Sequence, residues 1–353
     1  MALRYRTPLP ATQPRNLVTS LAPPKSQRWD AHSPSAQSAR WDAVDAARGI
    51  AIAAMVVYHF AWDLSFLKLI VTNTITDPGW KAFARTIAGT FLTLVGVGLA
   101  LAHAQGVRQA AFLKRLAKIG GAALLVTVAT VIAFPQSYIF FGILHCIAAA
   151  SVIALPFLRA PWFATLLAAL ACFVAPRVLT QSGFDHPALE WLGLGREEPI
   201  TNDYVPLFPW LGVVLLGLLA GQALVRHRER LAFTRWRAES PLSRLLVQAG
   251  RWSLPIYLVH QPLLLALLYG VLQITGPNPV AEAAPFIRQC TVGCVETRGD
   301  EALCRTACSC TAERSKPEGL WQGILANRLD PEERLRVNRI AQACLSGSVP
   351  RAP

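Results

Sequence analysis

The sequence predicts an all-α protein, a polytopic membrane helix bundle of about seven transmembrane helices followed by a small cysteine-rich helical tail. Hydrophobic residues make up 53% of the 353 residues, only 16% are charged, and the mean hydropathy is +0.36. Soluble domains rarely have this composition. The apolar residues gather in runs that are long enough, or nearly so, to cross a bilayer. Six of the eight cysteines lie beyond residue 277, which sets the tail apart from the bundle.

The composition divides the chain into three parts. Residues 1–40 are rich in Pro, Ser, Gln and Arg and contain no apolar core, so we expect a disordered cytoplasmic tail and neither a signal peptide nor a folded domain. Residues 41–276 contain the apolar runs and form the predicted transmembrane domain. Residues 277–353 form the predicted extracytoplasmic tail.

Seven apolar runs predict the membrane helices. The fifth run is short, and Pro135 and Gln136 between the third and fourth predict a tight helical hairpin. The runs cover roughly residues 46–67, 82–104, 119–135, 138–158, 161–176, 206–225 and 252–274.

The loops between the runs predict the orientation, because Lys and Arg are retained on the cytoplasmic side. Acidic residues are common in the loop 177–205, whereas cations follow the second, fourth and sixth runs: Lys114, Arg115, Lys118, Arg159, Arg226, Arg228, Arg230, Arg235, Arg237 and Arg244. We therefore expect a multi-pass protein of the bacterial inner (plasma) membrane with its N-terminus inside and its C-terminus outside. The net charge of +13 is spread over these loops, so we expect no nucleic-acid partner. The arginines after the sixth run also suit a phosphate or acidic lipid, although topology alone explains them.

The cysteines of the tail predict disulfides, because an even number lies on the expected outer side of the membrane. Two C-x3-C pairs on neighbouring helices place each pair on one helix face. An antiparallel hairpin then joins Cys290 to Cys308 and Cys294 to Cys304, which leaves Cys310 to pair with Cys344.

A zinc site is the competing interpretation of these cysteines. The nearest histidine is His260 inside a membrane run, and a four-cysteine site would leave two thiols over, so disulfides are favoured and no metal is expected. Cys146 and Cys172 lie within membrane runs and are expected to be small buried packing residues.

Ionisable residues inside the runs are the candidates for function, because such groups usually face a bundle interior or a wet cavity. Arg48 and His59 lie in the first run, about 16 Å apart along a helix. His145 lies in the fourth run and His260 in the seventh. Each histidine alone is typical of a hydrogen-bonded helix contact, but the three together with Arg48 indicate a polar cavity.

The first run also suggests roles for these residues. An imidazole at His59 can exchange protons near neutral pH. Asp63 lies one turn further along, where a carboxylate can reach the other ring nitrogen and fix its tautomer, or it is a solvated residue at the helix end. Arg48 either binds a phosphate or snorkels to the cytoplasmic interface.

Four segments in the same order resemble the bacterial proteins related to heparan-alpha-glucosaminide N-acetyltransferase, a family long catalogued as a domain of unknown function. The segments are DAARGIAIAAMVVYHFAWDL, YIFFGILHCIA, PLFPWLGVVLLGLLAG and GRWSLPIYLVHQPLL, and the resemblance covers roughly residues 40–275. The spacing of Arg48 and His59, with ten residues between them, is also similar to the R-x10-H motif of the acyltransferase-3 membrane enzymes. These enzymes belong to the same broader group.

The resemblance implies transfer of an acyl group, usually acetyl, from cytoplasmic acyl-CoA to a hydroxyl or amine of an extracytoplasmic glycan or glycolipid. On the acyltransferase-3 pattern, Arg48 contacts the CoA donor and His59 is the base or acyl carrier. His145 and His260 belong to matching motifs and are taken as substrate-binding candidates. The stretch TDPGWKAF has Asp77 and no histidine, so the catalytic histidine of the family's lysosomal member does not carry over. Acyl-CoA is expected as a substrate, with no permanently bound cofactor.

A transporter or lipid flippase is the alternative function, because a polar cavity in a bundle also serves translocation. Pro255, Gly96 and Gly98 are possible helix interruptions, although proline is tolerated in a first turn and glycines permit close helix packing. No internal inverted repeat, which many transporter folds show, is recognisable in the sequence.

Overall fold

The computed structural model describes residues 41–106 and 108–347, and every regular element in these residues is helical. The predicted disordered tail 1–40 lies outside the described residues. Five helices are long and apolar enough to cross a membrane: α1 (Asp42–Phe66), α2 (Pro78–Ala102), α3 (Gln109–Ala133), α6 (Leu207–Arg226) and α8 (Ser253–Thr275). Two shorter apolar helices accompany them, α4 (Ile143–Ile153) and α5 (Trp162–Val178). The predicted helical membrane bundle is therefore confirmed.

The fourth apolar run differs most from its prediction. Only Ile143–Ile153 of the predicted 138–158 is α-helical, and a helix of this length measures about 16 Å, roughly half of a hydrocarbon core. The run ends early because Pro156 begins a 3₁₀ turn. It begins late because residues before Gly142 pair with a distant loop: the Asn202 N–H donates to the Ser137 carbonyl, and the Val205 N–H to that of Phe141.

The connections also differ from the sequence prediction. The tight hairpin expected at Pro135 and Gln136 is a longer connection over residues 134–142. The arginine-rich segment after α6 contains a separate amphipathic helix, α7 (Pro241–Arg251), whose first turn Ser240 caps. Four 3₁₀ turns complete the bundle: η1 (Pro156–Leu158), η2 (Ser182–Asp185), η3 (Glu190–Leu192) and η4 (Ala232–Thr234).

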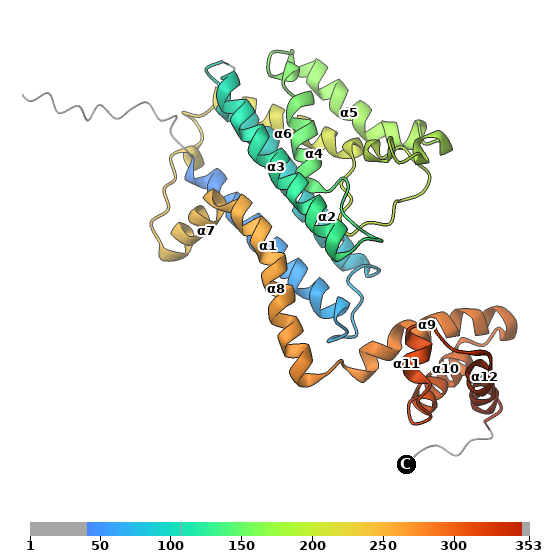
Figure 1. The fold of residues 1–353 in the computed structure, drawn as a ribbon. Helices are drawn as coiled ribbons and strands as arrows, with labels where there is room; N and C mark the ends of the chain where they lie inside the picture. The colour runs from blue at the N-terminus through green and yellow to red at the C-terminus, as the bar shows by residue number, and fades with distance from the viewer. Residues whose placement is uncertain (1–40, 107, 348–353) are drawn as a thin grey trace, which may run out of the picture. The chain divides into compact units, whose positions relative to one another are not determined.

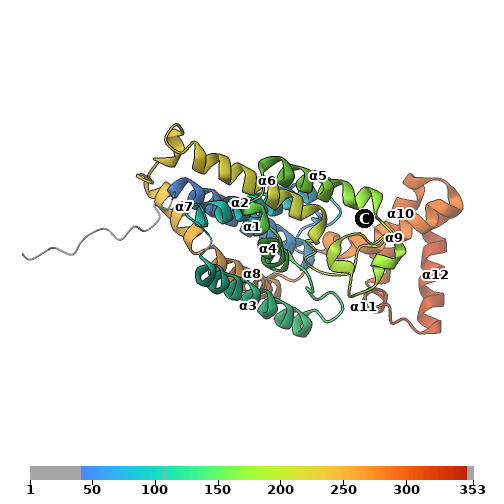
Figure 2. The same cartoon turned by 90° about the horizontal axis from the view of Figure 1, so that it is seen from above.

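The main core lies between α2, α4 and α6, with side chains of α3 and α5 around it. Helices α2 and α6 pack over their length, and α5 packs on the other side of α6 (Figures 1 and 2). The backbones of α2 and α6 approach closely at Gly96, where an added Cβ would collide with the Val214 carbonyl. Gly96 therefore permits close packing inside an unbroken α2 and does not mark a broken helix. Cys146 and Cys172 are buried in this core, as predicted.

Helix α1 packs against α2, α7 and α8, so it connects the main core to the last membrane helix. Pro255 lies in the first turn of α8 and does not interrupt it. The outward faces of α3 and α8 expose large apolar side chains: Leu124, Leu125, Ile132, Leu263, Leu267 and Ile274. Such apolar faces suit contact with lipid chains, because they leave no polar side chain without a hydrogen-bond partner in the hydrocarbon.

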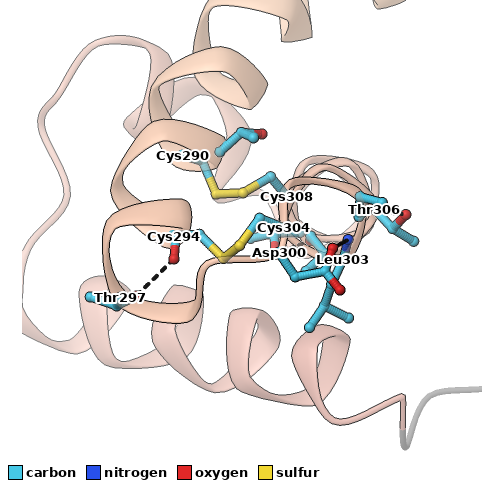
Figure 3. The surroundings of a disulfide bond; sticks show 12 residues. Cys290, Cys294, Thr297, Asp300, Leu303, Cys304, Thr306 and Cys308 are labelled. Atoms are coloured by element: carbon cyan, nitrogen blue, oxygen red, sulfur yellow. Dashed lines mark hydrogen bonds between the residues drawn. A yellow bond between two sulfur atoms is a disulfide. The ribbon is translucent and has the colours of Figure 1, made fainter.

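The tail is a separate helical structure of four helices: α9 (Pro279–Arg298), α10 (Glu301–Ser315), α11 (Trp321–Leu325) and α12 (Pro331–Leu345). Figure 3 shows two bridges joining α9 to α10, Cys290 to Cys308 and Cys294 to Cys304, and a third joins Cys310 to Cys344. All three predicted pairings are confirmed, with Cα–Cα distances of 5.7 to 5.9 Å that are usual for disulfides.

The apolar core of the tail is small. Ala283, Ala312 and Trp321 form one buried cluster, and the Trp321 indole N–H donates to Glu282 at 3.0 Å. Other apolar residues of the tail are buried as well: Ala281, Ala307, Leu320 and Ile340. Asp300 caps α10 by accepting the Leu303 N–H at 3.0 Å. The disulfides therefore account for much of what holds these helices together.

Candidate active site

Helix α1 presents polar side chains at two levels. Asp42, Asp45 and Arg48 lie three residues apart in its first turns, and His59 and Asp63 lie one turn apart near its other end. The helical spacing separates Arg48 from His59 by about 16 Å. The two levels contact different parts of the chain. The first level contacts the junction between α7 and α8, and the second contacts the middle of α8.

Arg48 belongs to an ion-pair network with the α7–α8 junction. It donates to Asp45 at 2.8 Å, and Asp45 is buried and also accepts from Arg251 at 3.3 Å. Arg251 reaches Asp42 at 3.0 Å. Gly98 of α2 leaves room for the Arg48 guanidinium, which an added Cβ would approach to 3.0 Å. Sequence reasoning singled out Arg48 and missed its partners, although the spacing of Asp42, Asp45 and Arg48 on one helix face was a usable signal.

Two further arginines lie near this network. Arg115 of α3 interacts electrostatically with Arg48, and Arg237 lies 4.0 Å from Asp42. Four arginines and two aspartates thus gather at this end of α1. The surplus of positive charge suits an anionic ligand, and guanidinium groups bind phosphates with paired hydrogen bonds.

His59 and His260 come together at the second level. Their ring centroids are 5.0 Å apart, with α1 supplying one ring and α8 the other. The Nδ1 atom of His260 faces the carbonyl oxygens of Tyr257 at 2.8 Å and Ile256 at 3.2 Å. The three histidines and Arg48 were expected to indicate one polar cavity, and of these His59 and His260 are in contact.

Asp63 does not make the contact with the His59 ring that its spacing in the sequence suggested. Its side chain is fully buried, which excludes a solvated position at the helix end. Its Oδ1 accepts from the Gln261 amide at 2.6 Å, and Asp63 forms no hydrogen bond with His59 in the structure. The sequence missed Gln261, whose only signal was a polar residue beside His260 in an apolar run.

Four buried polar atoms in this contact have no hydrogen-bond partner among the described residues: His59 Nδ1, Asp63 Oδ2, His260 Nε2 and Gln261 Oε1. Buried polar groups are nearly always paired, and leaving one unpaired costs about 1–3 kcal/mol. Four such atoms in one α1–α8 contact therefore indicate a site built for a polar ligand or for proton transfer. We name these four side chains the histidine cluster.

His145 lies apart from the histidine cluster. Its Nδ1 accepts the Gly142 N–H at 3.3 Å, so the other nitrogen carries the proton and donates to the Thr127 hydroxyl at 3.2 Å. Thr127 in turn donates to the Ile139 carbonyl at 2.7 Å. Both ring nitrogens thus have protein partners that tie α3 to the start of α4, and the prediction that His145 binds substrate stays a prediction.

The loop before α6 adds a carboxyl group near the start of α4. Asp203 accepts the Ile143 N–H at 2.9 Å. Burial raises the pKa of Asp203 to about 6, and the Ile143 hydrogen bond opposes the shift. Asp203 also interacts electrostatically with Tyr58 of α1 and Tyr257 of α8, two residues that flank the histidine pair.

In residues 41–106 and 108–347, no three His, Cys, Asp or Glu side chains gather as a metal site. What the histidine cluster offers is proton exchange at two imidazoles beside hydrogen-bond acceptors, with His260 buried and His59 partly exposed.

Comparisons with known proteins identify the family of this arrangement. Residues 40–262 match the family described as heparan-alpha-glucosaminide N-acetyltransferase, catalytic. A search of curated proteins and a search of solved structures return no match. The matched range begins just before α1 and includes His260 and Gln261, so it contains both levels of the site and excludes the disulfide tail. The chain therefore belongs to the heparan-alpha-glucosaminide N-acetyltransferase catalytic family, a family of membrane acetyltransferases.

Proposed function

We propose that this protein transfers an acetyl group from cytoplasmic acetyl-CoA to a hydroxyl or amine of an extracytoplasmic glycan or glycolipid. The observation that carries the proposal is the histidine cluster, which places two imidazoles and unpaired acceptor atoms inside the family's membrane domain. In this proposal the acetyl donor reaches the histidine cluster from one side of the membrane and the acceptor reaches it from the other side.

The donor side is the Arg48 end of α1. Arg48, Arg115, Arg237 and Arg251 outnumber Asp42 and Asp45 there, which supports binding of the CoA phosphates by charge and by paired hydrogen bonds. The roughly 16 Å from Arg48 to His59 is a distance that the extended pantetheine arm of CoA can cover. The phosphates then stay with the arginines while the thioester reaches the histidine cluster.

The acceptor side is the histidine cluster. His59 acts as general base toward the acceptor or carries the acetyl group itself. Oxygen atoms of Asp63 and Gln261 that lack protein partners suit the O–H or N–H donors of a glycan.

The orientation in this proposal has the N-terminus in the cytoplasm and the C-terminus outside. Two independent features support it, the cations in loops after the second, fourth and sixth apolar runs and the three disulfides of the tail. Labelling of thiols from outside intact cells, with and without prior reduction, tests it. We expect the six tail cysteines to react only after reduction, and tail thiols that react solely after lysis contradict the orientation.

The activity is tested with inside-out membrane vesicles and radiolabelled acetyl-CoA, followed into protein, lipid-linked glycan and soluble products. Wild type is compared with His59→Ala and with His103→Gln, a histidine at the end of α2 whose Nδ1 faces its own helix carbonyl at 2.9 Å. We expect transfer to fall at least about 100-fold in His59→Ala and to persist in His103→Gln. Folded wild-type protein that neither binds nor consumes acetyl-CoA contradicts the proposal and favours a transporter.

A further inference from the structure

The side chain that orients His59 has to be identified, because Asp63 is bonded elsewhere. A base that exchanges a proton through one ring nitrogen needs its other nitrogen held by a partner, which fixes the tautomer. The expected partner, Asp63, is hydrogen-bonded to Gln261. The ring that faces His59 across the helix contact is that of His260.

The protonation of His260 follows from its hydrogen bonds. Its Nδ1 faces two backbone carbonyls, Tyr257 at 2.8 Å and Ile256 at 3.2 Å. A carbonyl oxygen only accepts, so Nδ1 carries the proton. In the neutral ring Nε2 is then a lone-pair acceptor, and it is buried without a partner.

The geometry between the rings fits a hydrogen bond from His59 to this acceptor. Facing ring nitrogens at about 2.9 Å place the centroids of two imidazoles about 5 Å apart, and the observed separation is 5.0 Å. The nitrogen of His59 that lacks a partner in the same enclosed contact is Nδ1. Both atoms are without a partner in the structure, so the bond requires His59 Nδ1 to turn toward His260 Nε2.

We propose that His260 is the positioning residue of His59: its Nε2 accepts a hydrogen bond from His59 Nδ1–H, so that Nε2 of His59 keeps the lone pair that acts on the substrate. This rests on the acetyltransferase function proposed above and assigns to His260 the orienting role expected of Asp63. The Asp63–Gln261 hydrogen bond contributes by fixing the position of α8 along α1. His260, the neighbour of Gln261, then contacts α1.

The reaction balances with His59 as the base. Its Nε2 takes the proton of the acceptor O–H or N–H while the acceptor oxygen or nitrogen bonds to the thioester carbonyl carbon. The imidazolium formed keeps its Nδ1–H on His260 Nε2, which stabilises the positive charge. The proton then passes from His59 Nε2 to sulfur as the C–S bond breaks, which yields the acetylated acceptor and CoA thiol. If His59 instead carries the acetyl group, the same tautomer supplies the attacking lone pair.

Asp63 Oδ2 and Gln261 Oε1 also have no partner among the described residues, so the ring contact of 5.0 Å is what selects His260 as the acceptor for this bond. Tyr58 of α1 lies 5.4 Å from His59, and Tyr257 of α8 lies 5.9 Å from His260, both between ring centroids. Asp63 is held by Gln261, and Asp203 interacts electrostatically with both tyrosines. A tyrosine hydroxyl can accept a hydrogen bond as well as donate one, but neither hydroxyl holds His59 Nδ1, which has no partner among the described residues.

The first test reads the tautomer directly by nitrogen-15 NMR of labelled histidine in the full chain, reconstituted in lipid without acetyl-CoA. The signal of His59 among the seven histidines is assigned by its loss in His59→Gln. We expect His59 protonated on Nδ1 in wild type and shifted toward the Nε2-protonated form in His260→Leu. A wild-type His59 protonated only on Nε2, or a tautomer unchanged by His260→Leu, overturns the proposal.

The second test is kinetic and uses a conservative replacement. We expect His260→Leu to lower kcat about 100-fold while the KM for acetyl-CoA changes less than about threefold. His260→Gln places an oxygen acceptor near the position of Nε2, so at least about a tenth of the wild-type kcat should remain. His103→Gln is the control and should match wild type. Equal loss in His260→Leu and His260→Gln, or a loss confined to KM, contradicts the positioning role.

The two tests separate this inference from the proposed function. If wild type transfers no acetyl group, the proposed function fails while the NMR result still decides the tautomer. If wild type is active and His260→Leu leaves both kcat and the tautomer unchanged, the function stands and the role of His260 is wrong. If His260→Leu does not fold, wild type and His260→Gln alone give the tautomer.

Discussion

The membrane bundle and the disulfide tail are both all-helical, but different forces hold them together. In the bundle, a core of apolar side chains joins α2, α4 and α6, and α1 brings α7 and α8 to that core. In the tail, three disulfides link α9, α10 and α12 around a small apolar core. The bundle therefore depends on shape complementarity along whole helices, whereas the tail depends on six cysteines.

This difference determines how each region responds to substitutions. A packed helix contact spreads its stability over many side chains, each of which contributes modestly. A disulfide concentrates stability in one bond, mainly by restricting the unfolded chain. Small domains with too little core commonly use this second solution. Three predictions follow from the contrast, in order of expected size.

Removing the disulfides should unfold the tail and leave the bundle intact. The bridges span 18, 10 and 34 residues, and loops of these lengths contribute about 3–4 kcal/mol each. With all six tail cysteines changed to alanine, trypsin should cut within α9–α12 in minutes, as followed by mass spectrometry. Cys172→Ala, in the bundle, is the control and should keep the wild-type tail fragments. A tail that stays resistant without its disulfides would show that its small core suffices.

A pH change should affect the bundle through Asp203. Its folded pKa of about 6 lies above the ordinary value, so the folded state binds the proton more tightly than the unfolded state. Stability is then highest below about pH 4 and falls as pH rises toward 6, by up to about 3 kcal/mol.

The measurement for Asp203 is thermal unfolding in detergent across pH 4 to 7, read as wild type minus Asp203→Asn because other carboxyl groups also titrate there. The amide oxygen of asparagine still accepts the Ile143 N–H, so the variant should lack this part of the pH dependence. Parallel curves for the two proteins would show that Asp203 is not held in its neutral form.

A single methyl group in the α2–α6 contact should destabilise the bundle by about 2 kcal/mol. An added Cβ at Gly96 meets the Val214 carbonyl, which is backbone and cannot move aside as a side chain can. Gly120→Ala in α3 is the matched control, because a Cβ there meets nothing within 4 Å. Thermal unfolding should show a lower midpoint for Gly96→Ala alone. Equal midpoints would mean that the two helices separate without cost.

The sequence predicted the tail in greater detail than the bundle. The two C-x3-C spacings allow one simple antiparallel pairing, so the spacing of Cys290, Cys294, Cys304 and Cys308 already defines which helix faces meet. In the bundle, hydropathy located the apolar helices because length and composition set them. It did not show that the loop at 202–205 shortens α4, since this effect depends on contacts between distant segments. The shortening at Pro156 is a local effect of proline, which the hydropathy prediction did not use.

The candidate site was predictable by residue type and not by partner. His59 and His260 were recognised because imidazoles are rare in apolar runs. Their contact, and the bond of Asp63 to Gln261 instead of to His59, depend on how α1 and α8 are rotated against each other. No spacing within one helix encodes that rotation. Asp45 was overlooked although its spacing to Arg48 was a usable signal, whereas its second partner, Arg251 of α7, depends on tertiary packing.

The pairing of His59 with His260 also has a consequence for biosynthesis. The two rings come from the first and the last helix of the membrane domain, so one is inserted long before the other is made. The ribosome adds about 5–20 residues per second, which delays the second ring by about 10–40 s. Throughout that interval the nascent chain lacks one of the two rings. On the function proposed above, the protein becomes competent only when its final helix docks, and a product that stalls or ends before α8 remains chemically silent.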